Sequence, residues 1–264
     1  MGPSGPAVDY KRQVYELMDI QPADSIIDVG CGTGADVMAI AELLSTKTKR
    51  ESGGRVTGVD ISETMVDEAK EKLSERRRET TDKRISERIQ VEFYAGNAQQ
   101  LADVIPSNSY DVVRSDRSLQ HMPDPKAAVE EMVRISKPGV GRVVVSEPDW
   151  ETLVIDSPSH SRVTRKIINH FTDTRVNGWM GRQLYRLFQN AGLVDVQVLP
   201  MTCPIADLDF IRAAYLDKAQ RIAVEASVVT EQEASGWMAE LVDLNRAGQF
   251  FSTLTMYCAR GRVM

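Results

Sequence analysis

Short apolar runs alternate with amphipathic stretches along residues 8–150 of this chain. The runs cover residues 26–29, 55–59, 89–94, 110–115 and 140–146. Each run ends in glycine or polar residues, which favours a buried strand, and the stretches between carry apolar residues at helical spacing. Strands that alternate with helices in this way predict a doubly wound α/β sheet, mostly parallel, whose ligands bind beyond the carboxyl ends of the strands.

The pattern changes after residue 150. Helices are expected at 157–171 and 181–191, a sixth strand at 193–199, and a closing strand at 250–260. Two amphipathic helices, 205–229 and 231–245, lie between these last strands, and Thr230 with Glu233 forms a capping box at the start of the second. The second half of the chain therefore adds a helical block to the sheet.

The first strand runs into a glycine-rich turn, S-I-I-D-V-G-C-G-T-G, at residues 25–34. Glycines let a backbone approach a ligand closely, and such a turn before a helix is typical of nucleotide binding. An ordinary glycine-rich βα turn is the alternative, and the G-x-G-x-G pattern alone favours neither interpretation.

Polar side chains follow the predicted parallel strands and gather at one edge of the sheet. They are Asp28, Asp60, Asn97, Asp116, Glu147 and Asp149. An NAD site has some support, because Gly30, Gly32 and Ala35 match G-x-G-x-x-A. Its pyrophosphate would meet several carboxylates with only Arg114 and Arg117 near. S-adenosylmethionine, which carries a sulfonium and no phosphate, suits the acidic edge better.

The motifs together resemble the class I S-adenosylmethionine-dependent methyltransferases, in particular the small-molecule group typified by the ubiquinone/menaquinone methyltransferases. The similarity covers residues 10–150. It rests on I-I-D-V-G-C-G-T-G at 26–34, V-T-G-V-D-I-S at 56–62, G-N-A-Q-Q-L at 96–101, Y-D-V-V-R-S-D-R-S-L-Q-H-M-P-D-P at 110–125 and K-P-G at 137–139. The resemblance implies a Rossmann-like methyltransferase fold with a seven-stranded sheet and an antiparallel last strand.

The resemblance also implies which residues hold the cofactor. Asp28 and the turn from Gly30 through Cys31 and Gly32 to Gly34 would hold its methionine part, Asp60 its ribose hydroxyls, Ile61, Asn97 and Ala98 its adenine, and Ser115 its amino group. Many family members have Asp where this chain has Asn97. Asn also offers an acceptor oxygen, so we expect cofactor binding to survive that change.

His121 is the candidate catalytic base, because it follows the fourth strand on the side where an acceptor would approach. A packing or capping role is the alternative. Gln120, Trp150, Trp179 and Tyr215 are the further candidates for acceptor binding. The three histidines are dispersed, so no metal site is predicted.

Composition narrows the class of partner. The 264 residues carry a net charge of −6, which gives no attraction to nucleic acid or to an anionic membrane. Cys31, Cys203 and Cys258 are widely spaced, and the N-terminus M-G-P-S-G-P lacks the pattern of a secretion signal. We expect a cytoplasmic enzyme of small-molecule metabolism; a homodimer is left open.

Three parts of the chain are predicted to build the site. Residues 1–24 would form a helix over the cofactor cleft, residues 25–202 and 250–264 the methyltransferase core, and residues 203–249 a helical lid over the acceptor. An ornament on the sheet edge or a dimer interface is the alternative for the insertion.

Methyl transfer to an oxygen, nitrogen or carbon of a small, apolar or aromatic metabolite is thus the predicted function. A cyclase, isomerase or regulator that binds S-adenosylmethionine without methyl transfer is the alternative, ahead of an NAD-dependent oxidoreductase.

Overall fold

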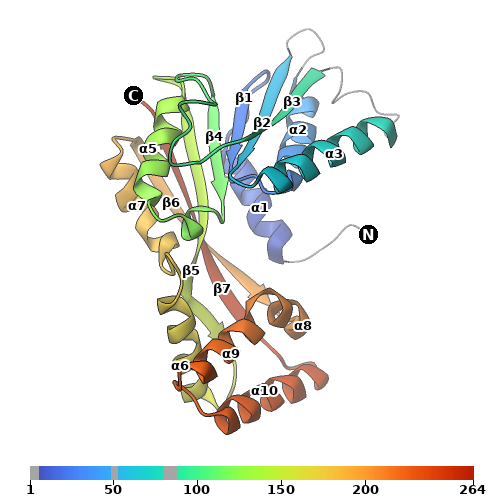
Figure 1. Ribbon diagram of the computed structural model, residues 1–264, viewed down its shortest axis with the longest axis vertical. Helices are drawn as coiled ribbons and strands as arrows, with labels where there is room; N and C mark the ends of the chain where they lie inside the picture. Colours follow the sequence, from blue (N-terminus) through green and yellow to red (C-terminus); the bar gives the residue numbers. More distant parts are fainter. Residues whose placement is uncertain (1–5, 49–52, 80–87) are drawn as a thin grey trace.

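The computed structural model describes residues 6–48, 53–79 and 88–264, and its centre is one seven-stranded sheet in the order β3-β2-β1-β4-β5-β7-β6 (Figure 1). The strands are β1 Ser25–Val29, β2 Gly54–Asp60, β3 Ile89–Ala95, β4 Val112–Asp116, β5 Arg142–Ile155, β6 Val194–Ile205 and β7 Ser252–Arg262. Neighbours from β3 to β5 pair in parallel, and β7 runs antiparallel to both β5 and β6. The predicted fold class is therefore confirmed.

Helices cover both faces of the sheet. The helices of the core are α1 Pro6–Leu17, α2 Ala35–Lys47, α3 Glu63–Glu79, α5 Pro125–Ile135 and α7 Met180–Asn190. Ile26 of β1 packs in the hydrophobic core with α2 and α3, whereas its neighbour Ile27 packs in the core with α5 and α7. This division follows from the strand itself, because successive side chains point to opposite faces.

A second helical group, which we call the lid, lies at one end of the sheet (Figure 1). It comprises α6 Ser161–Asp173, α8 Leu208–Ile211, the π-helical turn η2 Arg212–Leu216, α9 Asp217–Glu225 and α10 Glu231–Arg246. It has its own hydrophobic core around Trp237, and Trp237 Nε1 donates to Thr164 Oγ1 of α6 at 2.9 Å. The predicted insertion thus has a partner, α6, that precedes the sixth strand in the chain.

The lid also differs from the sequence prediction in its strands and helices. β5 continues to Ile155 and β6 to Ile205, well past the predicted ends at 146 and 199. The single helix expected at 205–229 is divided into α8, η2 and α9. The capping box of Thr230 and Glu233 at the start of α10 is confirmed.

Two further observations concern the end of α3 and the character of the helices. Helix α3 ends at Glu79, and residues 80–87 lie outside the described residues. No helix in the described ranges has the length and apolar character needed to cross a membrane.

Candidate active site

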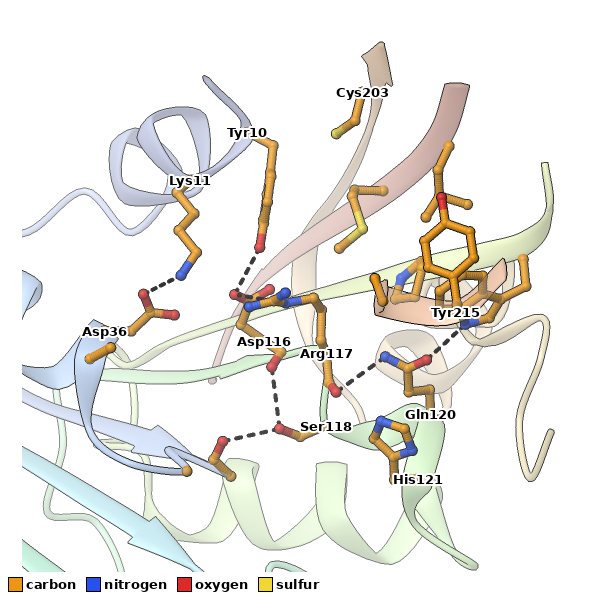
Figure 2. A pocket seen from close by; sticks show the side chains of 18 of the residues that line it. Tyr10, Lys11, Asp36, Asp116, Arg117, Ser118, Gln120, His121, Cys203 and Tyr215 are labelled. Carbon is orange, nitrogen blue, oxygen red and sulfur yellow. Dashed lines mark hydrogen bonds and ion pairs between the residues drawn. The ribbon is translucent and has the colours of Figure 1, made fainter. Parts of the chain in front are cut away.

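One cavity of about 940 Å³ lies where the carboxyl ends of the strands, α1 and the lid meet. Figure 2 shows Tyr10 and Lys11 entering from α1 on one side and Tyr215 standing on the other, with Gln120 and His121 below. Its volume is near the upper end of the range for ligand pockets, about 300–1,000 Å³, so it has room for a cofactor and an acceptor together. We call its two ends the cofactor end and the acceptor end.

The glycine turn after β1 forms one wall of the cofactor end. Gly32 has a φ of +52°, and a Cβ built on it would find only Met65 Sδ, at 3.9 Å, within contact distance. A side chain there would project into the cavity and occupy ligand space. Gly34, with φ +77°, is required for packing instead, because its Cβ would lie 2.8 Å from the Phe93 ring.

Asp60 at the end of β2 is held by the backbone around it. The Gly32 N–H donates to Asp60 Oδ2 at 2.8 Å and the Ser62 N–H to Oδ1 at 3.0 Å. A carboxylate keeps further lone pairs after accepting two such bonds, so Asp60 can still accept from a diol. Its own carbonyl accepts from the Gly96 N–H at 2.9 Å, which joins this loop to the one that contains Asn97.

A buried ion network closes the floor of the cofactor end. Arg114 of β4 is fully buried and donates to Asp28 at 2.7 Å, to Asp36 at 2.8 Å and to Asp116 at 3.1 Å. Lys11 of α1 also pairs with Asp36. Tyr10 adds a hydrogen bond to Asp116 at 3.2 Å. The acidic edge predicted from the sequence is therefore partly neutralised by side chains of the protein itself.

The pKa values of two of these acids show how uneven the network is. Burial raises the pKa of Asp28 to about 6 even though Arg114 opposes the shift. Burial also acts to raise the pKa of Asp36, but Arg114 and Lys11 outweigh it and hold that pKa well below its usual range. Asp36 is thus ionised at pH 7, whereas the pKa of Asp28 lies much closer to pH 7.

Glu147 anchors the 3₁₀ turn η1, Leu119–His121, that follows β4. The Leu119 N–H donates to Glu147 Oε1 at 2.6 Å, and burial raises the pKa of Glu147 to about 8. Glu147 does not line the cavity. Asp149 is likewise structural, since it pairs with Arg182 of α7 through Oδ1 and Nη2 at 2.9 Å. These two acids therefore hold the scaffold around the site.

His121 stands at the end of η1 and lines the cavity. Burial, followed by the positive charges of Arg175 and Lys218, lowers the pKa of His121 below its ordinary 6.5. The imidazole is consequently neutral at pH 7, the form that a general base requires.

Aromatic side chains form the acceptor end. The Trp150 ring meets the rings of Phe171 and Tyr215 edge-on, with centroids 5.3 and 5.1 Å away. The Arg175 guanidinium lies 4.4 Å from the centroid of Trp150 and 5.0 Å from that of Phe171. Gln120 Oε1 accepts from Trp150 Nε1 at 2.8 Å and from Arg175 Nη2 at 2.9 Å, which holds these groups in place.

The cavity brings together most of the residues predicted for the site. Those that line it are Asp28, Gly30, Cys31, Gly32, Asp60, Gln120, His121, Trp150 and Tyr215. Gly34, Ile61, Asn97, Ala98 and Ser115 do not line it. Ile61 is 73% exposed beside Asp60, whereas the buried Ser115 hydroxyl donates to the Val29 carbonyl. The predicted contacts of Ile61, Asn97, Ala98 and Ser115 with a cofactor stay predictions.

Trp179 is the N-cap of α7 and is absent from the cavity wall, so its predicted contact with an acceptor stays a prediction. Sequence reasoning missed Tyr10, Lys11, Phe171, Arg175 and Lys218, which do line the cavity. None belongs to a motif, and only their place in the fold reveals them.

Comparison with known proteins decides the family. The profile of the methyltransferase domain family matches residues 20–192. The chain belongs to the methyltransferase domain family. The prediction of a class I S-adenosylmethionine-dependent methyltransferase is thereby confirmed.

Two relatives show how this methyltransferase compares in sequence. An uncharacterized 37.1 kDa protein in transposon TN4556 of Streptomyces fradiae is 35% identical over 253 residues, which are 95% of this chain and 66% of that protein. The chain thus spans slightly less than two thirds of that relative. A demethylmenaquinone methyltransferase of Bacillus cereus is 27% identical over 211 residues, which are 75% of this chain and 81% of the relative.

Solved structures show the same fold. YcgJ from Bacillus subtilis has a TM-score of 0.61 at 18% identity, covering 96% of this methyltransferase and 99% of YcgJ. The [4+2]-cyclase SpnF has a TM-score of 0.54 at 21% identity, with 97% of this chain and 82% of SpnF covered. At these identities the likeness concerns the fold.

Proposed function

We propose that this protein transfers the methyl group of S-adenosylmethionine to an oxygen, nitrogen or carbon of a small-molecule acceptor with an apolar or aromatic body. One observation carries the proposal. A single cavity joins a glycine turn and a strand-end Asp60 at one end to His121 and an aromatic group at the other. Methyl transfer needs both ligands in one enclosed space, with the nucleophile in line with the methyl group.

The residues at the cofactor end fit S-adenosylmethionine. Gly32 leaves open the space that any side chain would fill, and Asp60 faces the cavity with acceptor capacity for a ribose diol. Arg114 neutralises much of the surrounding negative charge, and the acids left in excess favour the sulfonium and ammonium groups. When bound, the cofactor supplies a methyl group already activated by the sulfonium.

The residues at the acceptor end would orient the nucleophile and take its proton. The rings of Trp150, Phe171 and Tyr215 offer apolar surface for a planar body. His121, neutral at pH 7, would accept the proton that an oxygen or nitrogen nucleophile loses. The lid and α1 would exclude water from this space.

Incubation with methyl-labelled S-adenosylmethionine and fractionated small-molecule extracts tests the proposal. Transfer predicts labelled product together with an equal amount of S-adenosylhomocysteine. The demethylmenaquinone named for the Bacillus cereus relative belongs among the acceptors to be tried. Binding of the cofactor without S-adenosylhomocysteine formation across all fractions would argue against transfer.

A cyclase or isomerase that uses bound S-adenosylmethionine without transferring its methyl group is the second candidate. SpnF, described as a [4+2]-cyclase, has this fold and motivates keeping it. The same experiment separates the two, because such a reaction converts an acceptor without consuming S-adenosylmethionine.

A further inference from the structure

We propose that the acceptor of this enzyme carries an anionic group, a carboxylate or a phosphate, which Arg175 binds while the apolar body of the acceptor lies against Trp150 and Tyr215. The inference rests on the proposed function and narrows its substrate class. It would also make Arg175 the residue that distinguishes the true acceptor from neutral molecules of the same shape.

The cations around the cavity are not paired alike. Arg114 contacts three carboxylates, Lys11 pairs with Asp36, and Arg117 lies 3.7 Å from Asp116. Among the described residues, no carboxylate forms an ion pair with Arg175 or with Lys218, although both line the cavity. Asp207 also lines the cavity, but it caps α8 by accepting from the Phe210 N–H at 3.0 Å. Arg175 and Lys218 are thus cations of the cavity wall without an ion-pair partner.

The surroundings of Arg175 leave part of its guanidinium without a partner. Its Nη2 donates to the neutral Gln120 Oε1, while its Nε is buried and makes no hydrogen bond. Burial lowers the pKa of Arg175, so the folded protein bears a cost for keeping this charge in place. A buried donor without an acceptor is unfavourable, so the site around Nε is not optimised for the free protein. Nη1 makes no hydrogen bond with the described residues and is not one of the buried unpaired atoms, so Nη1 is the donor that an anion in the cavity would reach.

The acid whose charge acts on Arg175, Glu147, does not serve as that anion. Glu147 is the only carboxylate whose charge shifts the pKa of Arg175 among the interactions that set it. Glu147 is fully buried, accepts the Leu119 N–H, does not line the cavity and forms no ion pair with Arg175 among the described residues. Glu147 therefore does not take the place of an anion bound in the cavity.

The geometry suits recognition of a planar or tetrahedral anion. The guanidinium lies over the rings of Trp150 and Phe171, which holds its plane against rotation. A guanidinium so held presents a rigid fork of donors that matches carboxylate and phosphate oxygens.

Binding of matched probe pairs to the protein saturated with S-adenosylhomocysteine tests the inference. The probes are 4-hydroxybenzoate with 4-hydroxybenzamide, 3-hydroxy-2-naphthoate with its amide, and phenyl phosphate. Calorimetry on the wild type should show at least one anion binding about tenfold or more tighter than its neutral counterpart, because charge-assisted hydrogen bonds are the stronger ones. Phenyl phosphate against the carboxylates distinguishes the two kinds of anion.

Variants assign the preference to one side chain. Arg175→Gln should remove the preference for the anion, and Arg175→Lys should retain part of it. Arg162→Gln, which removes an exposed arginine of α6 outside the cavity, is the matched control and should bind as the wild type does. Circular dichroism on each variant checks that the fold is intact, and the wild-type comparison stands even where a variant fails to fold.

Equal affinity for anion and amide in the wild type, an undiminished preference in Arg175→Gln, or no binding of any probe would overturn the inference. Affinity for S-adenosylhomocysteine is measured first on the same protein. Loss there would count against the proposed function. Normal affinity there, with no preference for anions, would count against the anionic acceptor alone.

Discussion

The two ends of the cavity pair their arginines in opposite ways. At the cofactor end, Arg114 is fully buried and forms ion pairs with three carboxylates, which join β1, α2 and β4. At the acceptor end, Arg175 rests on aromatic rings and donates to a neutral amide. Arg114 therefore has a structural role, whereas Arg175 has donors left for a ligand.

Charge is also distributed differently between the ends. Four acids, Asp28, Asp36, Asp60 and Asp116, line the cofactor end and outnumber its cations Lys11, Arg114 and Arg117. Arg175 and Lys218 line the acceptor end, and Asp207, which precedes α8 and also lines the cavity, forms no ion pair with either of them among the described residues. A cofactor with cationic groups and an acceptor with an anionic one would each meet complementary charge, and the two ligands would attract each other across the cavity.

Among the changes that test the difference between the two ends, replacement of His121 is expected to have the largest effect, a fall in kcat. If His121 takes the proton of the acceptor, His121→Ala should lower kcat by about 10²–10⁴ with the affinity for S-adenosylmethionine unchanged. Wild-type kcat should fall as pH decreases through a pKa below 6.5, because the protonated imidazole is no base. Steady-state kinetics across pH measure both effects.

His170→Ala is the matched control, since His170 lies on α6 and does not line the cavity. A stability loss in His121→Ala with an unmoved pH profile would show that His121 only packs.

Arg114→Met should destabilise the whole fold by about 3–5 kcal/mol at pH 7, because it leaves buried carboxylates without their counter-ion. Asp28, whose pKa is about 6 even beside Arg114, would then have a still higher pKa in the folded state. An acid with a raised folded-state pKa favours folding at low pH, so the deficit should shrink as pH falls from 7 toward 5. Urea unfolding at several pH values measures this.

Arg246→Met removes an arginine from an exposed pair with Asp243 and should cost less than about 1 kcal/mol. Equal losses in the two variants would contradict the structural role given to Arg114.

Asp60→Ala should weaken S-adenosylmethionine binding about thirtyfold or more, which corresponds to roughly 2–4 kcal/mol for a charge-assisted contact to two hydroxyls. The variant also loses the acceptor of the Gly32 N–H, so the glycine turn should loosen. Calorimetry on the folded variant gives the affinity. Asp103→Ala, at an exposed position, controls for the loss of a negative charge. Unchanged cofactor affinity in Asp60→Ala would be inconsistent with the assigned cofactor end.

Hydrogen exchange should show the smallest effect, a rise in protection within 208–246 when an acceptor is added to the cofactor complex. A ligand at 100 times its Kd stabilises the bound form by about 2.7 kcal/mol, which sets the upper limit. Cofactor alone should protect the loops after β1 and β2 and leave the lid unchanged. If added acceptor protects the core loops but leaves exchange in the lid unchanged, the helical group does not cover the acceptor.

The sequence was sufficient for the features that depend on neighbouring residues. The apolar run from Ile26 to Val29 and the glycines after it specify a strand and a turn locally, and the structure has both. The capping box at Thr230 is equally local. The predicted cofactor end depends mainly on such short-range patterns.

The extension of β5 could not be predicted because it depends on distant partners. Residues 147–150 read E-P-D-W, which is typical of a loop. In the fold, Glu147 accepts a hydrogen bond from the Leu119 N–H and Asp149 pairs with Arg182, so both acids can be buried. Pro148 is tolerated because β4 ends opposite Ser146, so the backbone of Pro148 has no β4 residue to pair with and is opposed by β7 on its other side.

Arg175 escaped prediction for a related reason. It lies between two predicted helices in a segment without a motif. Its significance comes from Gln120 and Trp150, which the fold brings to it from η1 and β5, and from the nearby Phe171 at the end of α6. An arginine in a connecting segment is ordinarily a solvated surface residue. Only its placement over the aromatic rings changes that interpretation.

The long strands β5, β6 and β7 have a mechanical consequence. They run without a break from the core into the lid, with β7 hydrogen-bonded between the other two. Three paired strands, and not a flexible loop, therefore connect the lid to the core. Any displacement of the lid must bend this three-stranded ribbon. The register between β5 and β7 shifts between Asp149 and Val154, where the ribbon is most easily bent. Trp150 lies at this flexure, so the ring against which the acceptor packs would tilt whenever the lid opens.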